Sequence, residues 1–493
     1  MKTKYIWLLA GLIGFSACQS DDDSSTAAKV FPAATSGTAD FSKFVSVGAS
    51  FSAGYTDGAL FKAAQEKSFP KLLSEKFSLV GGGAFTQPLM NDNTGGLLVG
   101  GVPVAEYRLI FNGSGPQRLN DFLTGLGAPV PPITTDAAVN LMSTFNNYAV
   151  PGAKSFHITL PGYGALNPYF GRMASSGSAS MLGDAAAQVP TFFTFSEIGG
   201  NDVLGYATSG GIGVDQTGNF NPASYGPNDI TDPTVFKNVV DGALAVLTSN
   251  GTGAKGVVAN VPYVSSLPYF TTVPHNPVPL DAATAAQLNA GYAAYNGGLQ
   301  FALGNSLLTQ AEVEKRTVVF SESQTNALVL VDEDLTDLTA FGIPNYRQAT
   351  EADLLVLPLS SLIPQGYGTQ IQLEDQWVLT PEEQLAIKTA TDAYNQHLQD
   401  AVDLYGLALV DFKSILEQAS TTGVLSGQYL LTTDLVTGGL VSLDGVHLTT
   451  RGYAVLANEM MKVIDTTYGS NFEASGNMFD PADFPVVYSP SLQ

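Results

Sequence analysis

Short runs of β-branched, aromatic and aliphatic residues alternate with helical patterns and Gly/Pro breaks from Phe41 onward. Five of these runs have the character of strands, and each ends near a glycine, a proline or a polar cluster: 43–48, 144–150, 191–199, 255–261 and 407–412. Strands that alternate with helices are typical of a parallel sheet covered by helices. Ligands bind such sheets at the carboxyl ends of the strands, so we expect the candidate chemistry just after these runs.

The clearest helix signal lies between Thr380 and Gly406. Thr380 suits the N-cap, and Glu383 follows three residues later, as in a capping box. Pro381 suits the first helical position, and Gly406 ends the pattern. The predicted apolar face consists of Ile387, Tyr394, Leu398 and Val402.

Three long Gly/Pro-rich segments separate the predicted strands, at roughly 83–140, 205–235 and 317–376. They are longer than connections in a compact domain usually are, so we interpret them as insertions into one domain over 41–493. This domain can bury a large core, since 45% of the 493 residues are hydrophobic. The similar stretches "AYNGGL" (294–299) and "AYNQHL" (393–398) indicate two core-facing helices rather than a repeat.

The first residues have the pattern of an export signal. Two lysines precede an apolar run that is too short for a permanent membrane span, which is typical of a signal peptide over 1–17. The run ends in "FSAC", which resembles a bacterial lipobox with Phe15 in place of the usual leucine, so Cys18 is the predicted lipidation site. Residues 18–40 are acidic and Ser/Thr/Ala-rich, as in a flexible tether.

This N-terminus predicts an exported lipoprotein of the cell envelope, held in the outer membrane by its lipid. The acidic run after Cys18 also resembles the surface-export signal of Bacteroidetes lipoproteins. The alternative is an ordinary secretory signal with an incidental cysteine. Because Cys18 is the only cysteine of the sequence, the mature chain would have neither a disulfide nor a free thiol.

The charge balance argues against nucleic acid as a partner. The sequence has 21 basic and 44 acidic residues, a net charge of −23, and no Lys/Arg cluster. Such a surface repels a phosphate backbone. The N-terminus predicts a membrane as a partner, and the charge predicts that nucleic acid is not one.

Candidate catalytic residues follow the first and fifth predicted strands. Ser50 comes directly after the first, and "DGVH", with Asp444 and His447, follows the fifth and leads into a helix signal. A serine hydroxyl is a weak nucleophile until an imidazole takes its proton, and the imidazole needs a carboxylate to hold its tautomer and stabilise the cation. Ser50, His447 and Asp444 therefore form a candidate catalytic triad.

Donors for an oxyanion hole follow the other strands. Gly152 comes after the second strand in "VPGAKS", and Asn201 comes after the third in "GGND". The tetrahedral oxyanion formed by attack on an ester needs preorganised donors. The backbone N–H groups of Ser50 and Gly152 and the side-chain amide of Asn201 are the candidates, and glycine permits a close backbone approach.

These four blocks in this order resemble the SGNH/GDSL hydrolase superfamily, and the stretch "GASFSAGYTDGALF" resembles the first block of its exported Bacteroidetes members. The resemblance implies a three-layer α/β/α sandwich with a central parallel sheet of about five strands in flavodoxin-like order. It also implies hydrolysis of carboxylic esters through an acyl-enzyme, with no cofactor and no metal. One departure is Ala49, where the family pattern has an aspartate that is not a catalytic group.

Each site residue also has a plainer interpretation when taken singly. Ser50 and the Asn201-Asp202 pair could each cap a helix, and Gly152 could simply follow a proline in a turn. Asp444 and His447 could form a turn before a helix capped by Thr449 or Thr450, or a metal site, although no further His/Cys/Asp cluster accompanies them. We interpret the other histidines, His157, His275 and His397, as structural or surface residues.

An α/β-hydrolase shares the order Ser, Asp, His, but its nucleophile elbow needs a glycine where Ser52 stands. Within the superfamily, a carbohydrate O-deacetylase or an acyltransferase remains an alternative to an esterase or lipase. A non-catalytic surface lipoprotein that binds glycans or lipids is the alternative from another class.

Two Pro-Tyr-Phe segments leave the sheet near the predicted site. Their aromatic residues either pack under the insertions or line an acyl pocket or lid. On the second interpretation we expect a preference for medium or longer acyl esters over acetyl esters. The candidate pocket residues are Tyr169, Phe170, Tyr269 and Phe270.

Overall fold

The computed structural model describes residues 31–249, 251 and 253–492. Its centre is a parallel sheet of five strands in the order β13-β8-β7-β1-β6. The strands are β1 (Phe44–Gly48), β6 (Asn147–Ala149), β7 (Phe192–Ser196), β8 (Lys255–Ala259) and β13 (Ala408–Val410). Numbered along the chain, this order is 2-1-3-4-5, so the predicted strands and the flavodoxin-like order are confirmed.

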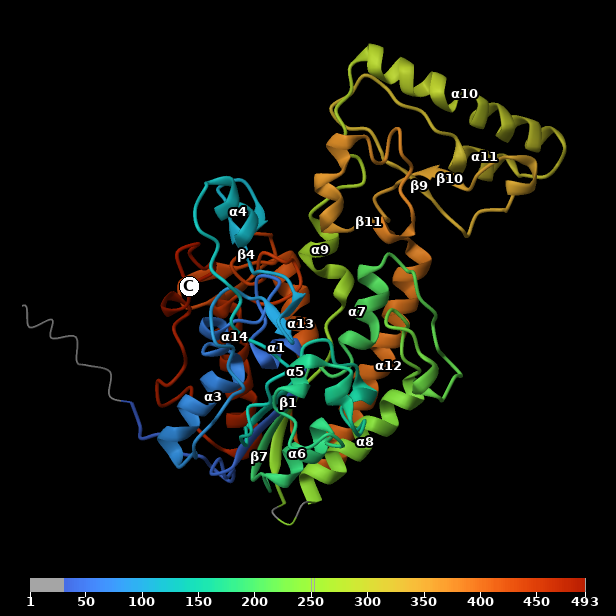
Figure 1. The fold of residues 1–493 in the computed structure, drawn as a ribbon. Coiled ribbons are helices and arrows are strands. Elements are labelled where there is room, and N and C mark those ends of the chain that lie inside the picture. Colours follow the sequence, from blue (N-terminus) through green and yellow to red (C-terminus); the bar gives the residue numbers. More distant parts are fainter. Residues whose placement is uncertain (1–30, 250, 252, 493) are drawn as a thin grey trace, which may run out of the picture.

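Helices cover both faces of this sheet, as the alternating pattern predicts (Figure 1). α3 (Phe69–Phe77) and α14 (Thr450–Tyr468) pack together on one face. The other face carries α6 (Met181–Ala187), α8 (Pro233–Ser249) and α12 (Pro381–Tyr405). The central strands β1 and β7 are buried along their whole length, which explains their continuous apolar runs.

The α12 helix begins and ends as its sequence signals predict. The Thr380 side chain caps it, the capping box with Glu383 is formed, and Gly406 ends it at φ 64°. All four residues of the predicted apolar face are buried. Figure 1 shows α12 running from the outlying part of the molecule down along the sheet.

Between α3 and β6 the chain forms two small hairpins and a helix on the side of the molecule that carries the carboxyl ends of the strands. The elements are β2 (Leu97–Val99), β3 (Val102–Ala105), β4 (Leu109–Phe111), β5 (Pro116–Arg118) and α4 (Leu119–Gly125). The shorter helices of the body are α1 (Ser50–Ala53), α2 (Lys62–Gln65), α5 (Pro168–Gly171), α7 (Asn201–Thr208) and α13 (Phe412–Thr421). A further hairpin, β14 (Val424–Ser426) with β15 (Tyr429–Leu431), follows α13.

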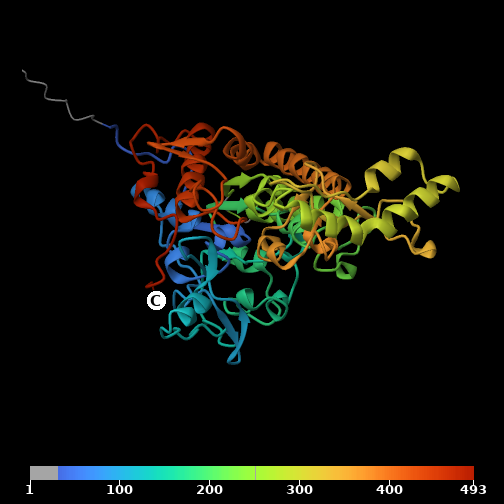
Figure 2. The same ribbon diagram turned by 90° about the horizontal axis from the view of Figure 1, so that it is seen from above.

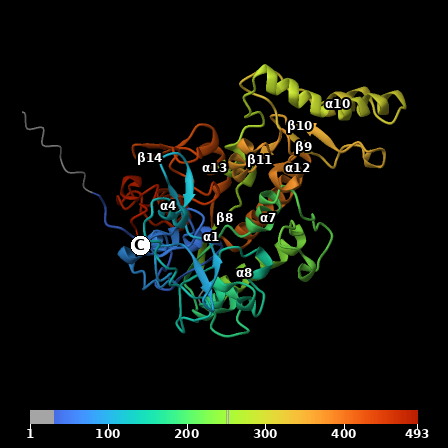
Figure 3. The same ribbon diagram turned by 45° about the horizontal axis from the view of Figure 1, so that its top comes forward.

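A lobe of residues 282–348 projects from one side of the body (Figures 1 and 2). It contains α10 (Ala282–Gly304), α11 (Gln310–Arg316), β9 (Val329–Val331) and β10 (Tyr346–Gln348). It joins the body through α9 (Pro268–Thr271), β11 (Leu354–Leu355) and β12 (Val378–Leu379), beside the start of α12 (Figure 3).

The lobe has two small hydrophobic cores of its own. The stretch 294–299 lies in α10, so the helix predicted there faces these small cores, whereas 393–398 on α12 faces the core of the body. The lobe begins before the insertion predicted for 317–376. Its separate cores explain why α10 has the pattern of an ordinary core-facing helix.

The predicted signal peptide, the lipidation site Cys18 and most of the tether lie outside the described residues. Among the helices of residues 31–249 and 253–492, none combines the length and the apolar character of a membrane span.

Candidate active site

Ser50 lies at the turn between β1 and α1. It is the first residue of α1, and among the described residues no side chain caps this helix, so Ser50 does not act as its cap. Gly48 permits the tight turn, because a Cβ there would lie 2.2 Å from Ser52 Oγ. Ser50 is 8% exposed and lines a cavity at the carboxyl edge of the sheet.

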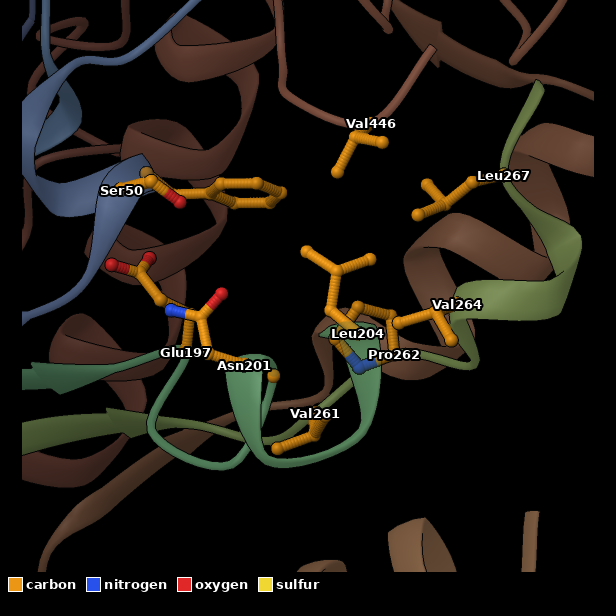
Figure 4. A pocket seen from close by; sticks show the side chains of 11 residues that line it. Ser50, Glu197, Asn201, Leu204, Val261, Pro262, Val264, Leu267 and Val446 are labelled. Carbon is orange, nitrogen blue, oxygen red and sulfur yellow. The ribbon is translucent and has the colours of Figure 1, made fainter. Parts of the chain in front are cut away.

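The buried carboxyl of Glu197 holds both flanks of Ser50. Its Oε1 atom accepts hydrogen bonds from the N–H groups of Ala49 (2.5 Å) and Ser52 (2.9 Å). Burial raises the pKa of Glu197 to about 8, although these hydrogen bonds act in the opposite direction. Figure 4 shows the carboxyl close to Ser50. Glu197 was not among the candidate residues predicted from the sequence. Its one signal there is a lone acid at the end of an otherwise apolar and hydroxyl-bearing strand.

Asp444 and His447 lie together in the loop before α14. The Asp444 Oδ2 atom is 2.9 Å from His447 Nδ1. The Oδ1 atom accepts the backbone N–H groups of Val446 and His447, each at 2.8 Å. These interactions hold the pKa of Asp444 well below its usual value, against the opposing effect of burial. The carboxylate is therefore ionised and fixed, as an imidazole-orienting group needs to be.

The loop that follows α1 also holds the Asp444 carboxylate. Gly58 donates its N–H to Asp444 Oδ2 at 2.8 Å. The Ser442 hydroxyl donates to Asp444 Oδ1 at 3.0 Å and accepts the N–H of Asp57 at 3.0 Å. Asp57 in turn accepts the N–H of Leu443 at 3.2 Å. The nucleophile segment and the acid–base loop are thus one hydrogen-bonded unit.

Gly152 and Asn201 are brought together by contacts between the loop after β6 and the start of α7. The Asn201 side chain donates to the Ala153 carbonyl at 2.9 Å. Asp202 accepts both the N–H (2.8 Å) and the hydroxyl (2.7 Å) of Ser155. No side chain of the described chain caps α7, so neither residue of the Asn-Asp pair acts as its cap.

Each of the three candidate oxyanion donors has an N–H hydrogen that is free to bind a ligand. Within the described residues, the N–H groups of Ser50 and Gly152 have no protein acceptor, and Asn201 uses one of its two amide hydrogens. Gly152 has φ +79°, and a Cβ there would meet nothing within 4 Å. The left-handed backbone at Gly152 is therefore one that favours glycine, and the space beside its Cα is open to a ligand.

Two cavities meet at this site. The small cavity, of about 40 Å³, is lined by Ser50, Phe51, Glu197, Gly200, Asn201, Leu204, Val261, Pro262, Val264, Leu267 and Val446. The large cavity, of about 410 Å³, includes Tyr55, Arg118, Gly152, Lys154, Asn201, Leu204, Thr208, Tyr269, Val446, Asp444 and His447 in its lining. The Phe51 and Tyr55 rings contact the His447 ring, with centroids 5.4 and 4.5 Å away.

The four aromatic residues predicted to line an acyl pocket lie in three different surroundings. Phe170 and Phe270 are 0% and 1% exposed and belong to the hydrophobic core, because rings without a polar atom gain most from full burial. Tyr169 lines a separate cavity of about 10 Å³. Tyr269 lines the large cavity.

The remaining histidines lie outside both cavities. His157 stacks on Tyr163 with ring centroids 4.5 Å apart, and burial lowers the pKa of His157 to about 4. His397 is on α12, and His275 is in the segment between α9 and α10. Within the described residues, no group of three or more His, Cys, Asp or Glu side chains is arranged to hold a metal ion.

Comparison with known proteins gives little beyond this geometry. No protein-family model and no curated protein matches the chain. A search of solved structures finds the crystal structure described as a "putative GDSL-like lipase" from Parabacteroides merdae, with 8% identity and a TM-score of 0.31 over 88% of this chain and 97% of that one. A TM-score this low carries no functional argument. By its own sheet order and by the sequence order of Ser50, Gly152, Asn201 and the "DGVH" block, the chain resembles the SGNH/GDSL hydrolase superfamily.

Proposed function

We propose that this protein is a serine hydrolase that cleaves carboxylic esters through an acyl-enzyme. The observation that carries the proposal is the fixed Asp444–His447 pair, at 2.9 Å, in a cavity that also contains Gly152 and Asn201 and adjoins Ser50. A largely buried carboxylate that orients an imidazole, with a serine and unpaired N–H donors on the adjoining cavities, is the arrangement that acyl transfer requires.

In the first half-reaction the Ser50 hydroxyl attacks the ester carbonyl carbon and passes its proton to His447 Nε2, since Nδ1 faces Asp444. The oxyanion is stabilised by the N–H groups of Ser50 and Gly152 and by the Asn201 amide. His447 then gives the proton to the leaving alkoxide as the carbon–oxygen bond breaks. Water attacks the acyl-enzyme by the same proton route and releases the carboxylic acid.

Labelling with a fluorophosphonate tests the nucleophile. The reagent is expected to modify the protein at Ser50, and Ser50→Ala is expected to abolish the labelling. Ser420→Ala, on the exposed side of α13, is the matched control and should label normally. A non-catalytic binding protein on the same scaffold would not label at all, and that result would contradict the proposal.

Steady-state kinetics on a p-nitrophenyl ester test the other roles. We expect Ser50→Ala and His447→Ala each to lower kcat by about 10⁴-fold or more, because triad members act as a unit. Asn201→Ala removes one of three oxyanion donors and is expected to cost about 10²–10³-fold. His397→Ala on α12 is the control for histidine loss and should leave kcat unchanged. An active, folded Ser50→Ala variant would contradict the assignment of the nucleophile.

We further propose that the enzyme is tethered to the cell envelope through a lipid on Cys18. The support is the lipobox-like "FSAC" sequence and the acidic segment after it. Cys18→Ser should move the protein from the membrane to the soluble fraction in a bacterium that processes lipoproteins. Unchanged membrane association of this variant would count against the tether.

A further inference from the structure

The two cavities at the site differ in which catalytic groups they contain. The small cavity contains Ser50, the large cavity contains His447, and both are bordered by Asn201, Leu204 and Val446. The small cavity is walled mainly by aliphatic side chains, and Figure 4 shows Leu204, Val264 and Leu267 around the space beyond Ser50. The large cavity has hydroxyl, amide and cationic side chains in its lining.

The proton path decides which part of an ester enters which cavity. His447 must reach the leaving oxygen, because it returns the proton to the alkoxide. The alcohol therefore occupies the large cavity, which His447 lines. The acyl carbon is bound to Ser50 and its oxygen faces the oxyanion donors, so the remaining substituent, the acyl chain, points into the small cavity.

We infer, on the basis of the proposed esterase function, that the small cavity is the acyl pocket and that it accepts acyl groups of up to about four or five carbons, the carbonyl carbon included. One water-sized group needs roughly 10–15 Å³ of such space. The cavity of about 40 Å³ therefore holds on the order of three or four such groups. The substrate preference inferred from the sequence, medium or longer acyl chains, is replaced by this one.

The walls of the pocket are built into the core and do not give way easily. Val261, Val264 and Leu267 are 0%, 4% and 3% exposed. They belong to the main hydrophobic core, where inserting further methylenes costs about 1–3 kcal/mol. An acyl chain longer than the cavity would have to displace these packed side chains.

The large cavity fits a polar alcohol that is bigger than the acyl group. Its volume of about 410 Å³ lies in the range of small-molecule sites, roughly 300–1,000 Å³. Tyr55, Arg118, Thr208 and Tyr269 bring polar atoms to its lining. The substrate class is therefore a short-chain acyl ester of a polar alcohol, of which an O-acetylated sugar is the simplest example.

The first experiment measures kcat/KM for p-nitrophenyl esters from acetate to decanoate. The wild type is expected to rise from acetate to a peak near butyrate, because each accommodated methylene adds to binding, and to fall steeply at hexanoate. Leu267→Ala and Val264→Ala each enlarge the pocket, so either variant should raise the hexanoate-to-acetate ratio by about tenfold, since each accommodated methylene is worth about fourfold. Leu288→Ala, an equal truncation in the lobe core, is the control and should keep the wild-type profile.

The second experiment compares glucose pentaacetate with ethyl acetate, which share the acyl group and differ in the alcohol. The sugar ester should have the higher kcat/KM by about tenfold or more. Equal values would overturn the assignment of the large cavity to a polar alcohol.

The outcomes separate this inference from the proposed function. A wild-type profile that peaks at octanoate or longer, with Ser50 still labelled by the fluorophosphonate, would overturn the acyl pocket and leave the hydrolase intact. Unchanged acyl profiles in both folded pocket variants would do the same. Absence of labelling and of hydrolysis of every ester would overturn the hydrolase and the pocket with it.

Discussion

At Ser50 the backbone of the candidate catalytic turn depends on a carboxyl that follows another strand. The superfamily pattern has an aspartate just before the serine, and this chain has Ala49. The Ala49 N–H is instead bound by Glu197, which follows β7 at φ 51°. A non-glycine residue in the left-handed region carries a cost of order 1–3 kcal/mol, so the fold imposes this conformation. We interpret Glu197 as a positioning residue for the turn.

The raised pKa of Glu197 predicts a pH effect on stability. Its folded pKa of about 8 exceeds the ordinary value of 4.5, so between these values the folded chain keeps a proton that the unfolded chain has released. The contribution of Glu197 to the free energy of unfolding is therefore fully present below about pH 4.5, and it is lost as pH rises towards 8. Glu197→Gln keeps a hydrogen-bond acceptor and cannot ionise, so its free energy of unfolding relative to wild type should rise between pH 5 and pH 8.

Urea denaturation of both proteins at pH 5, 6.5 and 8 measures this difference. Asp57, whose pKa burial raises to about 7, contributes equally to both proteins and cancels. A difference that stays constant across the three pH values would mean that Glu197 is ionised in the folded protein.

The α12 helix carries its own start and stop signals, and its end shows how a single glycine acts. Gly406 stands at φ 64°, and a Cβ there would meet nothing within 4 Å. Its role is therefore conformational, because other residues enter the left-handed region only at a cost of about 1–2 kcal/mol. Gly242 offers a contrast, since it is an exposed glycine inside α8, also with nothing near its Cβ position.

The same substitution at these two glycines should have opposite effects. Gly406→Ala is expected to lower the free energy of unfolding by about 1 kcal/mol. Gly242→Ala should raise it by about 0.5–1 kcal/mol, because alanine is the better helix former. Urea unfolding measures both, and a neutral Gly406→Ala would show that the strained conformation relaxes without cost.

In the molecule as a whole, the lobe is joined to the body by buried charges as well as by apolar contacts. Arg347 in β10 pairs with Asp353 at 2.7 Å and with Asp332, and all three side chains are at most 3% exposed. The Arg347 guanidinium holds the pKa of Asp353 below its usual value. Removing the guanidinium would leave the buried Asp353 carboxylate without a cation and the buried Asp332 carboxylate with only the exposed Lys315, 3.5 Å away, which is far costlier than losing a surface pair.

Arg347→Ala is therefore expected to destabilise the lobe by about 3–5 kcal/mol. Hydrogen exchange should speed up across 282–348, while the central sheet stays protected and fluorophosphonate labelling persists. Lys315→Ala removes the exposed cation 3.5 Å from Asp332 and is the matched control, with an expected cost of at most about 1 kcal/mol. Uniform loss of protection in Arg347→Ala would mean that lobe and body unfold together.

Much of the fold could be predicted because its signals are local. The five strands appear as apolar runs of the right length, and α12 is bounded by Thr380 and Gly406 in sequence as in structure. The alternation of strands and helices then implies the parallel sheet. Ser50 could be selected because it directly follows a strand, at the edge where parallel strands end together. The Asp444–His447 pair could be selected because the carboxylate stands three residues before the imidazole, just ahead of a helix signal.

The sequence by itself thus determined the strands, the main helix, the class of sheet and the candidate catalytic residues. Hydrophobic periodicity, helix-capping residues and the spacing of motif residues are all properties of residues that are close together in the sequence. Only the tertiary structure decided that Glu197 reaches Ala49, that Phe170 and Phe270 belong to the core, and that the cavity beside Ser50 is small. Each of these depends on contacts between segments far apart along the chain. The volume left between packed side chains is what remains after all of those contacts have formed, so no local pattern encodes it.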